Sequence, residues 1–434
     1  MVRMDKKIVV LGIGYVGLPP AIALANVGYK VTGVDINKEV VKSINEGIVT
    51  IKEKHIETIF NSKNVRSNFV AIGKPCQADA FIICVQTPLD RISKLPDLSN
   101  VISAVESITP FLRKGNLIVI ESTIPPFTCR KIIKPIMEKS TKLKVGRDVF
   151  LAHCPERIMP GETFYELIHN NRIIGGIDSK SARLAKEIYA SFVEGDIELT
   201  DDLTAEMVKL MENTYRDVNI ALANEFSLVA DTLGVDVKEA INLANKHPRV
   251  KILSPGIGVG GHCLPKDPWF LIHSDPRNTS LIFTARKVNE LMPEKKASEI
   301  RRFLRNVPDP KIVALGLTYK PDSDDLRESP SLEVIRILQE DGYNVSAYDN
   351  FVKGYEYKSI ADISKNADCV VVLVEHTSIK EELEKFEDKI KSAMRTPLIL
   401  RIGTSYKPDT FDARQRVTSL KSVQKILKRD TKKK

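Results

Sequence analysis

The sequence lacks any hydrophobic segment long enough to cross a membrane as a helix. Hydrophobic residues make up 43% of the 434 residues, but no apolar run approaches the roughly 20 residues that a membrane-spanning helix needs. Low-complexity tracts are also absent. The first residues, MVRMDKKIVVLG, enter a strand-like pattern at once, which leaves no room for a signal peptide. We therefore expect a globular, cytoplasmic protein that does not act in a membrane.

Cysteine is scarce and scattered. The six cysteines stand singly, without CxxC spacing and without a close Cys/His cluster: Cys76, Cys84, Cys129, Cys154, Cys263 and Cys369. This spacing argues against a disulfide framework and against a structural zinc site. We expect free thiols and no metal.

Basic segments with interleaved aromatic residues, which RNA-binding modules carry, are missing as well. The formal net charge is +9, but the only concentrated basic run is the tail at 424–434. Such a tail is typical of a solvated chain end. We therefore expect no nucleic-acid partner, and assign the positive charge a smaller role, the attraction of an anionic small substrate.

The N-terminal part has the pattern of a parallel α/β fold. A chain of this length is too long for one compact core. Residues 7–37 read as strand, glycine turn, helix and strand, and strand-like runs follow at 80–88, 117–123 and 149–157. The segments between them are long enough for crossover helices, so the pattern predicts a doubly wound parallel sheet.

The middle of the chain changes to helical periodicity. A 3.6-residue pattern predicts one long helix over 204–234, which ends at a glycine, and shorter patterns predict helices over 236–247 and 280–306. We expect this region to form a helical domain.

The C-terminal part repeats the N-terminal pattern. The segment 311–320 resembles 7–16, and 342–350 resembles the segment beginning at Gly28; 368–376 fits a third strand. Such self-similarity indicates a second copy of the same architecture. We predict two Rossmann-like domains joined by a central helical domain, with boundaries at 1–200, 201–306 and 307–434.

A glycine motif follows the first strand. Gly12, Gly14 and Gly17 form GxGxxG, and Asp35 closes the next strand. The glycines permit a tight turn and a close approach of a pyrophosphate to a helix N-terminus, while the acid binds ribose hydroxyls. A tight packing turn is the alternative. Because Asp35 would repel a 2′-phosphate, the pattern favours NAD over NADP.

One face of the predicted long helix collects polar side chains. Glu206, Lys209, Asn213, Arg216 and Ile220 follow each other at spacings of three and four, which places them in one stripe. A solvated face is the ordinary interpretation of such a stripe, and a catalytic face is the alternative.

The stretch GIGVGGHCLPKDPWF at 256–270 places a cysteine in a glycine-rich loop. Exposed loop amides and Lys266 would favour the reactive thiolate of Cys263, and Asp267 could orient or accept protons. A structural cysteine is the alternative. His262 has no companion metal ligands nearby and is assigned a supporting role in the loop.

These parts suit one chemistry together. A dinucleotide accepts hydride, a thiol captures an aldehyde, and a Lys/Asn pair stabilises an oxyanion. Oxidation of an alcohol to an aldehyde, capture by the thiol, oxidation to a thioester and hydrolysis would use each part. The sequence therefore predicts a four-electron oxidation of an alcohol to an acid.

Several longer motifs resemble the UDP-glucose/GDP-mannose dehydrogenases along nearly the whole chain. The matching segments are Gly12-Gly14-Gly17, CVQTP at 84–88, ESTIPP at 121–126, CPERIMPG at 154–161, Lys209-Asn213-Arg216, GGHCLPKD at 260–267 and YKPDSDDLRESPS at 319–331. The resemblance implies two Rossmann-like domains joined by a long helix that serves in dimerisation.

The resemblance also implies roles for individual residues. Cys263 is expected as the nucleophile, Lys209 and Asn213 as the oxyanion site, and Asp267 with Glu156 as the groups that handle water and protons. NAD is expected at Gly12, Gly14, Tyr15, Val16, Gly17, Asp35, Thr87, Thr123 and Arg327. The UDP-sugar is expected at Arg157, Ile158, Lys209, Asn213, Arg216, His247, Arg249, Gly260, Tyr319 and Lys320. The expected assembly is a homodimer or a dimer-based homo-oligomer, with Arg249 reaching the substrate of the partner subunit.

Departures from the family pattern bear on the sugar. UDP-glucose enzymes typically carry a second acid four positions after the residue that matches Glu156, and Pro160 stands there in this chain. An acid is a poor neighbour for an N-acetyl methyl group, so its absence favours a 2-acetamido sugar. Residues 247–263, followed by DPWF, resemble the branch that oxidises UDP-N-acetylmannosamine. UDP-N-acetylglucosamine and UDP-glucose are the alternatives.

Two departures affect loop shape only. Gln86 replaces the usual Pro of the CVPTP motif, and Phe127 with Cys129 replaces the Gly and the Thr of the usual PGTT. Both leave the backbone conformation of these loops unpredicted, although Thr87 and Thr123 match the family motif.

Two other classes of protein remain as alternatives. A two-electron dehydrogenase of the β-hydroxyacid type shares the N-terminal fold and a catalytic lysine, but leaves Cys263 and the second α/β repeat unexplained. A non-catalytic sensor of nucleotide sugars would have little use for Cys263, Lys209 and Asn213 together.

Overall fold

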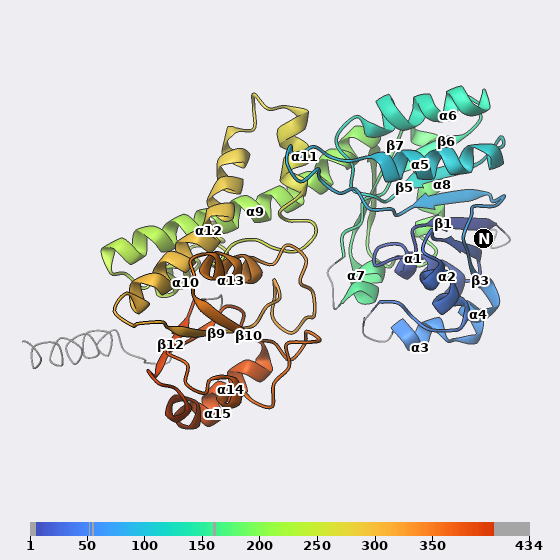
Figure 1. Ribbon diagram of the computed structural model, residues 1–434. Coiled ribbons are helices and arrows are strands. Elements are labelled where there is room, and N and C mark those ends of the chain that lie inside the picture. The colour runs from blue at the N-terminus through green and yellow to red at the C-terminus, as the bar shows by residue number, and fades with distance from the viewer. Residues whose placement is uncertain (1–5, 52, 54–55, 159–161, 403–434) are drawn as a thin grey trace, which may run out of the picture. The chain divides into compact units, whose positions relative to one another are not determined.

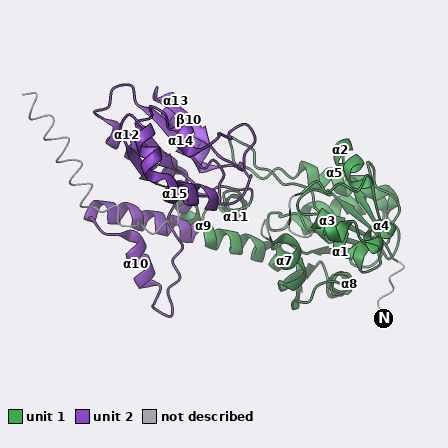
Figure 2. Cartoon of the chain, turned by 90° about the horizontal axis from the view of Figure 1, so that it is seen from below, with its two compact units in different colours: residues 1–216, 263–284 green, residues 217–262, 285–434 purple. Residues whose placement is uncertain are grey.

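The computed structural model describes residues 6–402 apart from 52, 54–55 and 159–161. The chain divides into two compact units (Figure 2): Met1–Arg216 with Cys263–Thr284, and Asp217–His262 with the residues from Ala285 onward. The basic tail at 424–434 lies outside the described residues. The three-domain division with boundaries at 200 and 306 stays a prediction.

The first unit is built on an eight-stranded sheet with the order β3-β2-β1-β4-β5-β6-β7-β8. Every neighbouring pair is parallel except β6 and β7. The strands are β1 (Lys7–Leu11), β2 (Lys30–Val34), β3 (Phe69–Ile72), β4 (Ala80–Ile83), β5 (Leu117–Ile120), β6 (Phe150–His153), β7 (Arg172–Gly176) and β8 (Ile197–Asp201). The predicted doubly wound sheet is confirmed.

Helices cover both faces of this sheet (Figure 1). They are α1 (Leu18–Asn26), α2 (Lys38–Asn45), α3 (Ile56–Phe60), α4 (Lys63–Asn68), α5 (Ser99–Ile108), α6 (Lys134–Thr141), α7 (Thr163–His169) and α8 (Ser179–Tyr189). The helix α11 (Asp267–Ser274) also belongs to this unit, but it packs against Leu210 through Phe270 and Leu271. Local capping fixes several starts: the side chains of Asn37 and Asp178 accept hydrogen bonds from the first-turn amides of α2 and α8, which are otherwise unpaired.

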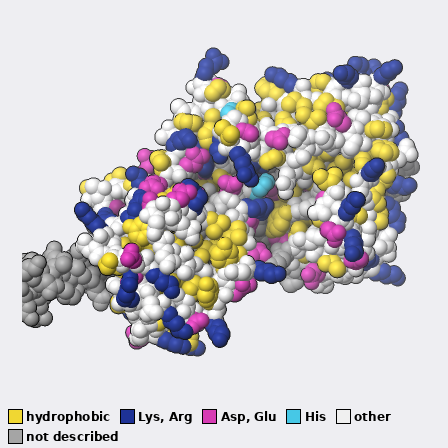
Figure 3. Space-filling model, in the orientation of Figure 1, with side chains coloured by type: hydrophobic (Ala, Val, Ile, Leu, Met, Phe, Trp, Pro, Cys, Tyr) yellow, Lys and Arg dark blue, Asp and Glu magenta, His cyan; other side chains and the backbone are white. Residues whose placement is uncertain are grey.

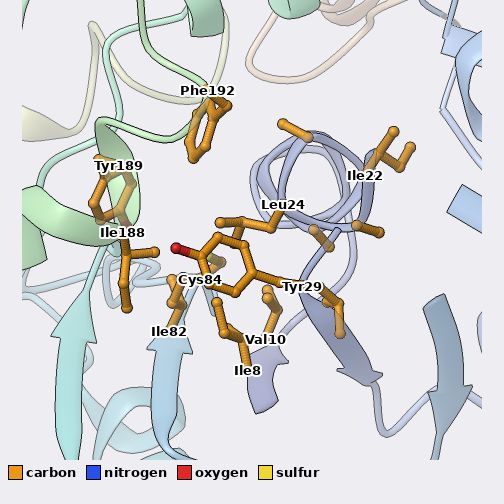
Figure 4. Close-up of a cluster of buried hydrophobic side chains, with 14 of the residues drawn as sticks. Ile8, Val10, Ile22, Leu24, Tyr29, Ile82, Cys84, Ile188, Tyr189 and Phe192 are labelled. Atoms are coloured by element: carbon orange, nitrogen blue, oxygen red, sulfur yellow. The ribbon is translucent and has the colours of Figure 1, made fainter. Parts of the chain in front are cut away.

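The core of the first unit lies on the two faces of the sheet. β4, β5 and β6 are buried at every position, as expected for strands covered on both sides. On one face, side chains of α1 and α8 pack against β1 and β4 around Tyr29 and Tyr189 (Figure 4). On the other face, residues of α5 and α6 form a second cluster. The strand ends are thereby held rigidly.

The long predicted helix is α9 (Asp202–Leu233), and its residues up to Arg216 belong to the first unit. The other two predicted helices are α10 (Val237–Ala244) and α12 (Ser280–Leu304). All three predictions are confirmed within a few residues at each end. Among the described residues, no helix combines the length and the apolar character needed to span a membrane.

The second unit contains a four-stranded sheet with the order β10-β9-β11-β12, and all of its pairs are parallel. Its strands are β9 (Lys311–Leu315), β10 (Asn344–Tyr348), β11 (Cys369–Val372) and β12 (Leu398–Arg401), and its helices include α13 (Pro330–Glu340), α14 (Ile360–Ile363) and α15 (Thr377–Ala393). The predicted second copy of the α/β architecture is confirmed. On the face in Figure 3, lysine and arginine side chains are dispersed among acidic and apolar ones.

The sequence analysis missed the strands at the far edge of the first sheet. β7 has the sequence RIIGG, whose glycine pair resembles a turn signal, and β8 is a partly exposed strand without an apolar run. The analysis also extended three strands of this sheet too far, because β4 ends at Ile83, β5 at Ile120 and β6 at His153. The polar residues beyond these ends leave the sheet and belong to the candidate site.

Candidate active site

The glycine turn after β1 has three glycines with three different surroundings. Gly12 has φ +83°, and a Cβ there would lie 2.9 Å from the carbonyl oxygen of Cys84. A Cβ at Gly17 would lie 2.0 Å from the Gly12 oxygen. A Cβ at Gly14 would meet nothing within 4 Å. The first and third glycines are thus required by the protein, whereas the space at Gly14 is open for a ligand at the start of α1.

Asp35 is oriented by the main chain beside this turn. One carboxylate oxygen accepts the amide of Ile13 at 3.2 Å, and the other accepts the amide of Asn37 at 2.9 Å. The side chain is only partly buried, so lone pairs remain for ribose hydroxyls. The predicted neighbours are also in place: the Tyr15 hydroxyl lies 3.1 Å from Oγ1 of Thr163, and Val16 packs against the core.

Thr87 and Thr123 meet where β4 and β5 end. The Thr87 hydroxyl donates to the Thr123 carbonyl at 2.8 Å. The ammonium of Lys266 donates to the Thr87 carbonyl at 2.9 Å and lies 3.3 Å from its hydroxyl. Lys266 is therefore bonded to the strand end.

Four buried polar side chains come together from three segments of the first unit. Lys209 and Asn213 lie one turn apart on α9, Glu156 follows β6, and Asp267 begins α11. The Lys209 ammonium is 3.7 Å from Oε2 of Glu156. The Asn213 amide donates to Oδ2 of Asp267 at 2.6 Å. The structure thus brings these predicted catalytic residues together.

The solvated-face interpretation of the α9 stripe is wrong for its first members. Glu206, Lys209 and Asn213 are 0%, 5% and 8% exposed. Ionisable side chains are almost never buried to this degree unless they are paired. Arg216 at the end of the stripe is exposed.

The charged groups in this cluster stabilise one another's ionised forms. Burial acts to lower the pKa of Lys209, but the neighbouring Glu156 and Asp267 outweigh it, so the pKa is raised and the ammonium persists. Burial raises the pKa of Asp267, although Lys266 and Lys209 oppose the effect. Oδ1 of Asp267 has no hydrogen-bond partner in the described part of the chain. It is an available proton acceptor.

Cys263 lies directly before α11. Its carbonyl accepts the amides of Lys266 at 3.0 Å and Asp267 at 2.9 Å. Burial, and secondly the charge of Asp267, raises the pKa of the thiol to about 11, while Lys209 and Lys266 only partly compensate. The expectation that loop amides and Lys266 favour a thiolate is therefore wrong, because desolvation dominates.

The predicted sugar contacts in the first unit have protein partners. Arg157 forms an ion pair with Glu212 of α9, with NH2 to Oε1 at 2.6 Å. The amide of Ile158 donates to Oε1 of Glu156. The segment after β6 is thereby fixed on the helix.

The remaining predicted contacts lie in the second unit: His247, Arg249, Gly260, Tyr319, Lys320 and Arg327. His247 and Arg249 are exposed beyond α10. Arg327 pairs with Asp325, its NH2 lying 2.6 Å from Oδ2. Tyr319 and Lys320 follow β9, and the Lys320 carbonyl accepts the Thr318 hydroxyl at 2.8 Å.

The glycine stretch before Cys263 has a packing reason that the sequence did not reveal. Gly258 and Gly261 have φ +132° and +86°. A Cβ at Gly260 would lie 2.6 Å from both the Glu328 carbonyl oxygen and Cβ of Tyr319. The glycines therefore fit the loop against the 319–330 segment of its own unit.

His153, at the end of β6, is a buried polar residue that the sequence analysis overlooked. Its Nδ1 lies 2.8 Å from the Ile120 carbonyl, which only accepts, so Nδ1 carries the proton. Nε2 has no partner in the described part of the chain. Burial, with a smaller contribution from the Lys209 charge, lowers the imidazole pKa to about 3, although the bond to the Ile120 carbonyl opposes this shift. The position three residues before Glu156 was the available signal.

Glu206 explains how the chain tolerates Phe127 in place of glycine. Phe127 has φ +71°, and Glu206 accepts its amide at 2.7 Å and that of Cys129 at 2.9 Å. Cys129, Asp202 and Glu206 bring potential metal-ligand atoms within 4.8 Å of one another. Because Glu206 is bonded to amides and Asp202 to Arg130, we assign no metal to them.

A glycine turn that opens a doubly wound sheet, together with a buried Lys/Asn/carboxylate cluster beside a cysteine, is the arrangement of a dinucleotide-dependent oxidoreductase. The chain belongs to the UDP-glucose/GDP-mannose dehydrogenase family. Its NAD binding, central and UDP binding domains match residues 6–193, 203–291 and 313–401.

Three similar proteins are named for the same sugar nucleotide. The UDP-N-acetyl-D-mannosamine dehydrogenase of Methanococcus vannielii is 49% identical over 402 residues, covering 91% of this chain and 92% of the relative. A solved structure of UDP-D-ManNAc dehydrogenase from Pyrococcus horikoshii has a TM-score of 0.87 at 44% identity, covering 93% and 97% of the two chains. That of the UDP-N-acetyl-mannosamine dehydrogenase Cap5O from Staphylococcus aureus has a TM-score of 0.83 at 39% identity, covering 92% and 98%.

Proposed function

We propose that the protein oxidises UDP-N-acetyl-D-mannosamine at C6 to UDP-N-acetyl-D-mannosaminuronate, with two NAD molecules as hydride acceptors. The observation that carries the proposal is the buried cluster of Lys209, Asn213 and Asp267 beside Cys263, in the same unit as the glycine turn. The names of the relatives support the choice of sugar. The proposed site combines a thiol, an oxyanion site and a dinucleotide-binding turn, and an alcohol-to-acid oxidation requires all three.

The residues of the glycine turn fit NAD. Open space at Gly14, the close turn at Gly12 and Gly17, and the partly exposed carboxylate of Asp35 are what a dinucleotide without a 2′-phosphate requires. When bound, NAD accepts hydride from C6 of the sugar. We assign the other predicted contacts of NAD to Tyr15, Val16, Thr87, Thr123 and Arg327.

The first oxidation needs a stabilised alkoxide. The Lys209 ammonium and the Asn213 amide donate hydrogen bonds to the C6 oxygen, and the hydroxyl proton leaves towards Glu156, which lies 3.7 Å from the ammonium. Loss of hydride from C6 then gives the aldehyde. Persistence of the ammonium, which Glu156 supports, is therefore required.

The second oxidation needs the thiol. Because the Cys263 pKa is about 11, the proton leaves as sulfur attacks the aldehyde carbon. The acceptor that we assign is Oδ1 of Asp267, which lies 3.9 Å from the Lys266 ammonium and has no hydrogen-bond partner in the described part of the chain. The thiohemiacetal loses a second hydride and becomes a thioester. Water, deprotonated by Asp267 or Glu156, cleaves the C–S bond and the thiol is regenerated, so that the alcohol, water and two NAD⁺ give the acid, two NADH and two protons.

We assign the sugar nucleotide to the predicted contact residues: Arg157, Ile158, Lys209, Asn213, Arg216, His247, Arg249, Gly260, Tyr319 and Lys320. We propose that residues 1–200 bind NAD, that 201–306 form the dimerisation domain with catalytic residues, and that 307–434 bind the UDP-sugar. A cytoplasmic enzyme of this type would supply a uronic acid donor for polysaccharide biosynthesis.

We also propose a homodimer, or a dimer-based homo-oligomer, formed through α9. The helix exposes large apolar side chains at spacings of three, four and seven residues: Met207, Met211, Tyr215, Leu222, Phe226, Val229 and Leu233. A second copy of the helix would cover this stripe. Sedimentation equilibrium of the wild type and of Phe226→Glu tests the assembly, and an unchanged mass would contradict it.

The thiol step is tested by Cys263→Ser. We expect the variant to bind NAD normally and to form no uronate, whereas Cys76→Ser, a change at another partly buried thiol, should behave as wild type. Rates with UDP-N-acetylmannosamine, UDP-N-acetylglucosamine and UDP-glucose then test the sugar. Full activity of Cys263→Ser would refute the covalent route, and preference for another sugar would refute only the substrate assignment.

A further inference from the structure

Two adjacent residues after β6 form ion pairs with two residues of α9 that lie about one turn apart. Glu156 pairs with Lys209 at 3.7 Å, and Arg157 pairs with Glu212 at 2.6 Å. The second pair is also bidentate, since Nε of Arg157 donates to Oε2 of Glu212 at 3.2 Å. Glu212 directly precedes Asn213, so both pairs border the catalytic cluster.

The order of charges fixes the register of this segment on the helix. The segment carries acid then base at 156 and 157, and α9 carries base then acid at 209 and 212. A slip by one helical turn would place Glu156 against Glu212, or Arg157 against Lys209. Each slip would oppose like charges near a buried site, where repulsion is weakly screened.

The guanidinium of Arg157 forms hydrogen bonds to two separate parts of the protein. Besides Glu212, its NH1 donates to the Asn171 carbonyl at 2.7 Å. The Asn170 amide returns a bond to the Arg157 carbonyl at 3.2 Å. Arg157 therefore ties α9 to the turn between α7 and β7, and this geometry gives it a task other than holding the sugar.

We infer that Arg157 and Glu212 are positioning residues that hold Glu156 against Lys209. The inference rests on the proposed function, because it assigns the pair to the alkoxide-forming step. It replaces the predicted substrate contact of Arg157 and gives Glu212 a role that the sequence analysis did not assign. The pair touches neither the thiol nor the dinucleotide turn, so its loss should leave both intact.

The test compares Glu212→Gln and Arg157→Gln with wild type in steady-state kinetics. We expect kcat to fall about tenfold in both, because small displacements of a catalytic group are costly, while KM for both substrates stays within about twofold. Arg113→Gln is the matched control, since Arg113 pairs with Asp79 at 2.9 Å in the same unit, away from the cluster. The control should keep wild-type kcat.

The pH profile separates positioning from simple loss of stability. Glu156 raises the pKa of Lys209, so displacement of Glu156 should lower that pKa and move the alkaline limb of kcat to lower pH. A variant that is merely less stable keeps the wild-type limb at temperatures where it is folded. The exchanged pair Arg157→Glu/Glu212→Arg keeps opposite charges in the native register, but it no longer opposes like charges in a slipped one, and a glutamate cannot donate to the Asn171 carbonyl. It should therefore stay impaired, whereas Arg157→Lys should recover most of kcat.

The competing role of Arg157 gives a different result. If Arg157 binds the sugar nucleotide, Arg157→Gln raises KM for that substrate, and Glu212→Gln leaves both constants near wild type; this outcome overturns the inference. Wild-type kcat and an unshifted profile in both variants overturn it too. Absence of turnover by the wild-type enzyme with every sugar nucleotide would instead mean that the proposed function has failed.

Discussion

The two glycine turns of the molecule share a backbone plan. Gly12 after β1 and Gly316 after β9 have φ +83° and +79°. Their amides donate to the carbonyls that end β2 and β10, at 2.8 and 2.9 Å. Asp35 and Asp349 occupy matching places, and each accepts the amide that follows the glycine. The internal repeat extends to the hydrogen bonds.

The acids of the two turns nevertheless differ in what surrounds them. Asp349 is 0% exposed and accepts Nε2–H of His376 at 2.9 Å, while Nδ1 of His376 accepts the Asp322 amide at 2.8 Å. Asp35 is partly exposed, and the donors that it meets among the described residues are main-chain amides. The carboxylate of Asp349 is thus enclosed by the protein, whereas that of Asp35 is accessible to a ligand. A repeated fold does not repeat the binding site.

The largest effect should come from adding a methyl group to the second turn. A Cβ at Gly316 would lie 1.9 Å from the Val374 carbonyl oxygen, at a positive φ. We expect Gly316→Ala to destabilise the second unit by about 3 kcal/mol or more, measured by urea unfolding. Gly14→Ala, with open space around its Cβ, should keep wild-type stability and weaken NAD binding. Equal stability of both variants would contradict the comparison.

We expect the buried Asp349 to contribute to the stability of the fold and the partly exposed Asp35 to contribute to NAD binding. Asp349→Asn should reduce the free energy of unfolding by about 2 kcal/mol, because a charge-assisted bond to His376 is lost inside the protein. Asp35→Asn should change stability little. Thermal unfolding of the two variants decides, and a larger loss for Asp35→Asn would reverse the assignment.

Acid should erase the difference between Asp349→Asn and wild type. Burial acts to raise the pKa of Asp349, but hydrogen bonds from His376, Leu317 and Phe351 outweigh it, so the pKa is lowered. A lowered carboxyl pKa contributes stability above the ordinary value of about 3.9 and loses it as the pH falls through the folded value. Unfolding measured from pH 6 to pH 3 should show the two proteins converging. A constant gap would contradict this.

The open acid sets the cofactor. We expect Asp35→Asn to weaken NAD binding about tenfold, equivalent to about 1.4 kcal/mol, and to narrow the preference over NADP because the repelling charge is gone. Titration calorimetry with both cofactors measures this. Asp349→Asn serves as the control and should bind NAD as wild type does.

The smallest effect concerns a left-handed position without glycine. Phe127 has φ +71° and packs under the Lys131 ammonium, 4.2 Å from the ring centroid. Phe127→Gly removes backbone strain of about 1–2 kcal/mol, and loses the cation–π contact and chain rigidity worth about 1 kcal/mol. We expect a gain of about 0.5 kcal/mol in thermal unfolding. A loss above about 1 kcal/mol would show that the backbone is unstrained.

Local pattern predicted much of this molecule. The glycine motif, the acid that ends β2 and the similarity of 311–320 to 7–16 predicted the α/β architecture of both units, because these signals are short. They did not reveal β7 and β8 at the edge of the first sheet. The spacing of Lys209 and Asn213 also predicted that they share one face of α9. Contacts between segments distant in the sequence could not be predicted from local pattern. His376 closes Asp349 from 27 residues away, and Glu212 meets Arg157 across 55 residues.

Desolvation was equally hidden from the sequence. The neighbouring Lys266 led us to expect a lowered pKa for the Cys263 thiol, but burial raises that pKa instead. Burial is a property of the packed chain, so spacing alone could not reveal it.

The stoichiometry of NADH formation tests the central claim most directly. With a limiting amount of UDP-N-acetylmannosamine and excess NAD, the absorbance of NADH at completion is measured against the uronate formed. The thiol mechanism predicts two NADH per sugar nucleotide, with no free aldehyde. One NADH per sugar nucleotide, with aldehyde as the product, would contradict the role assigned to Cys263.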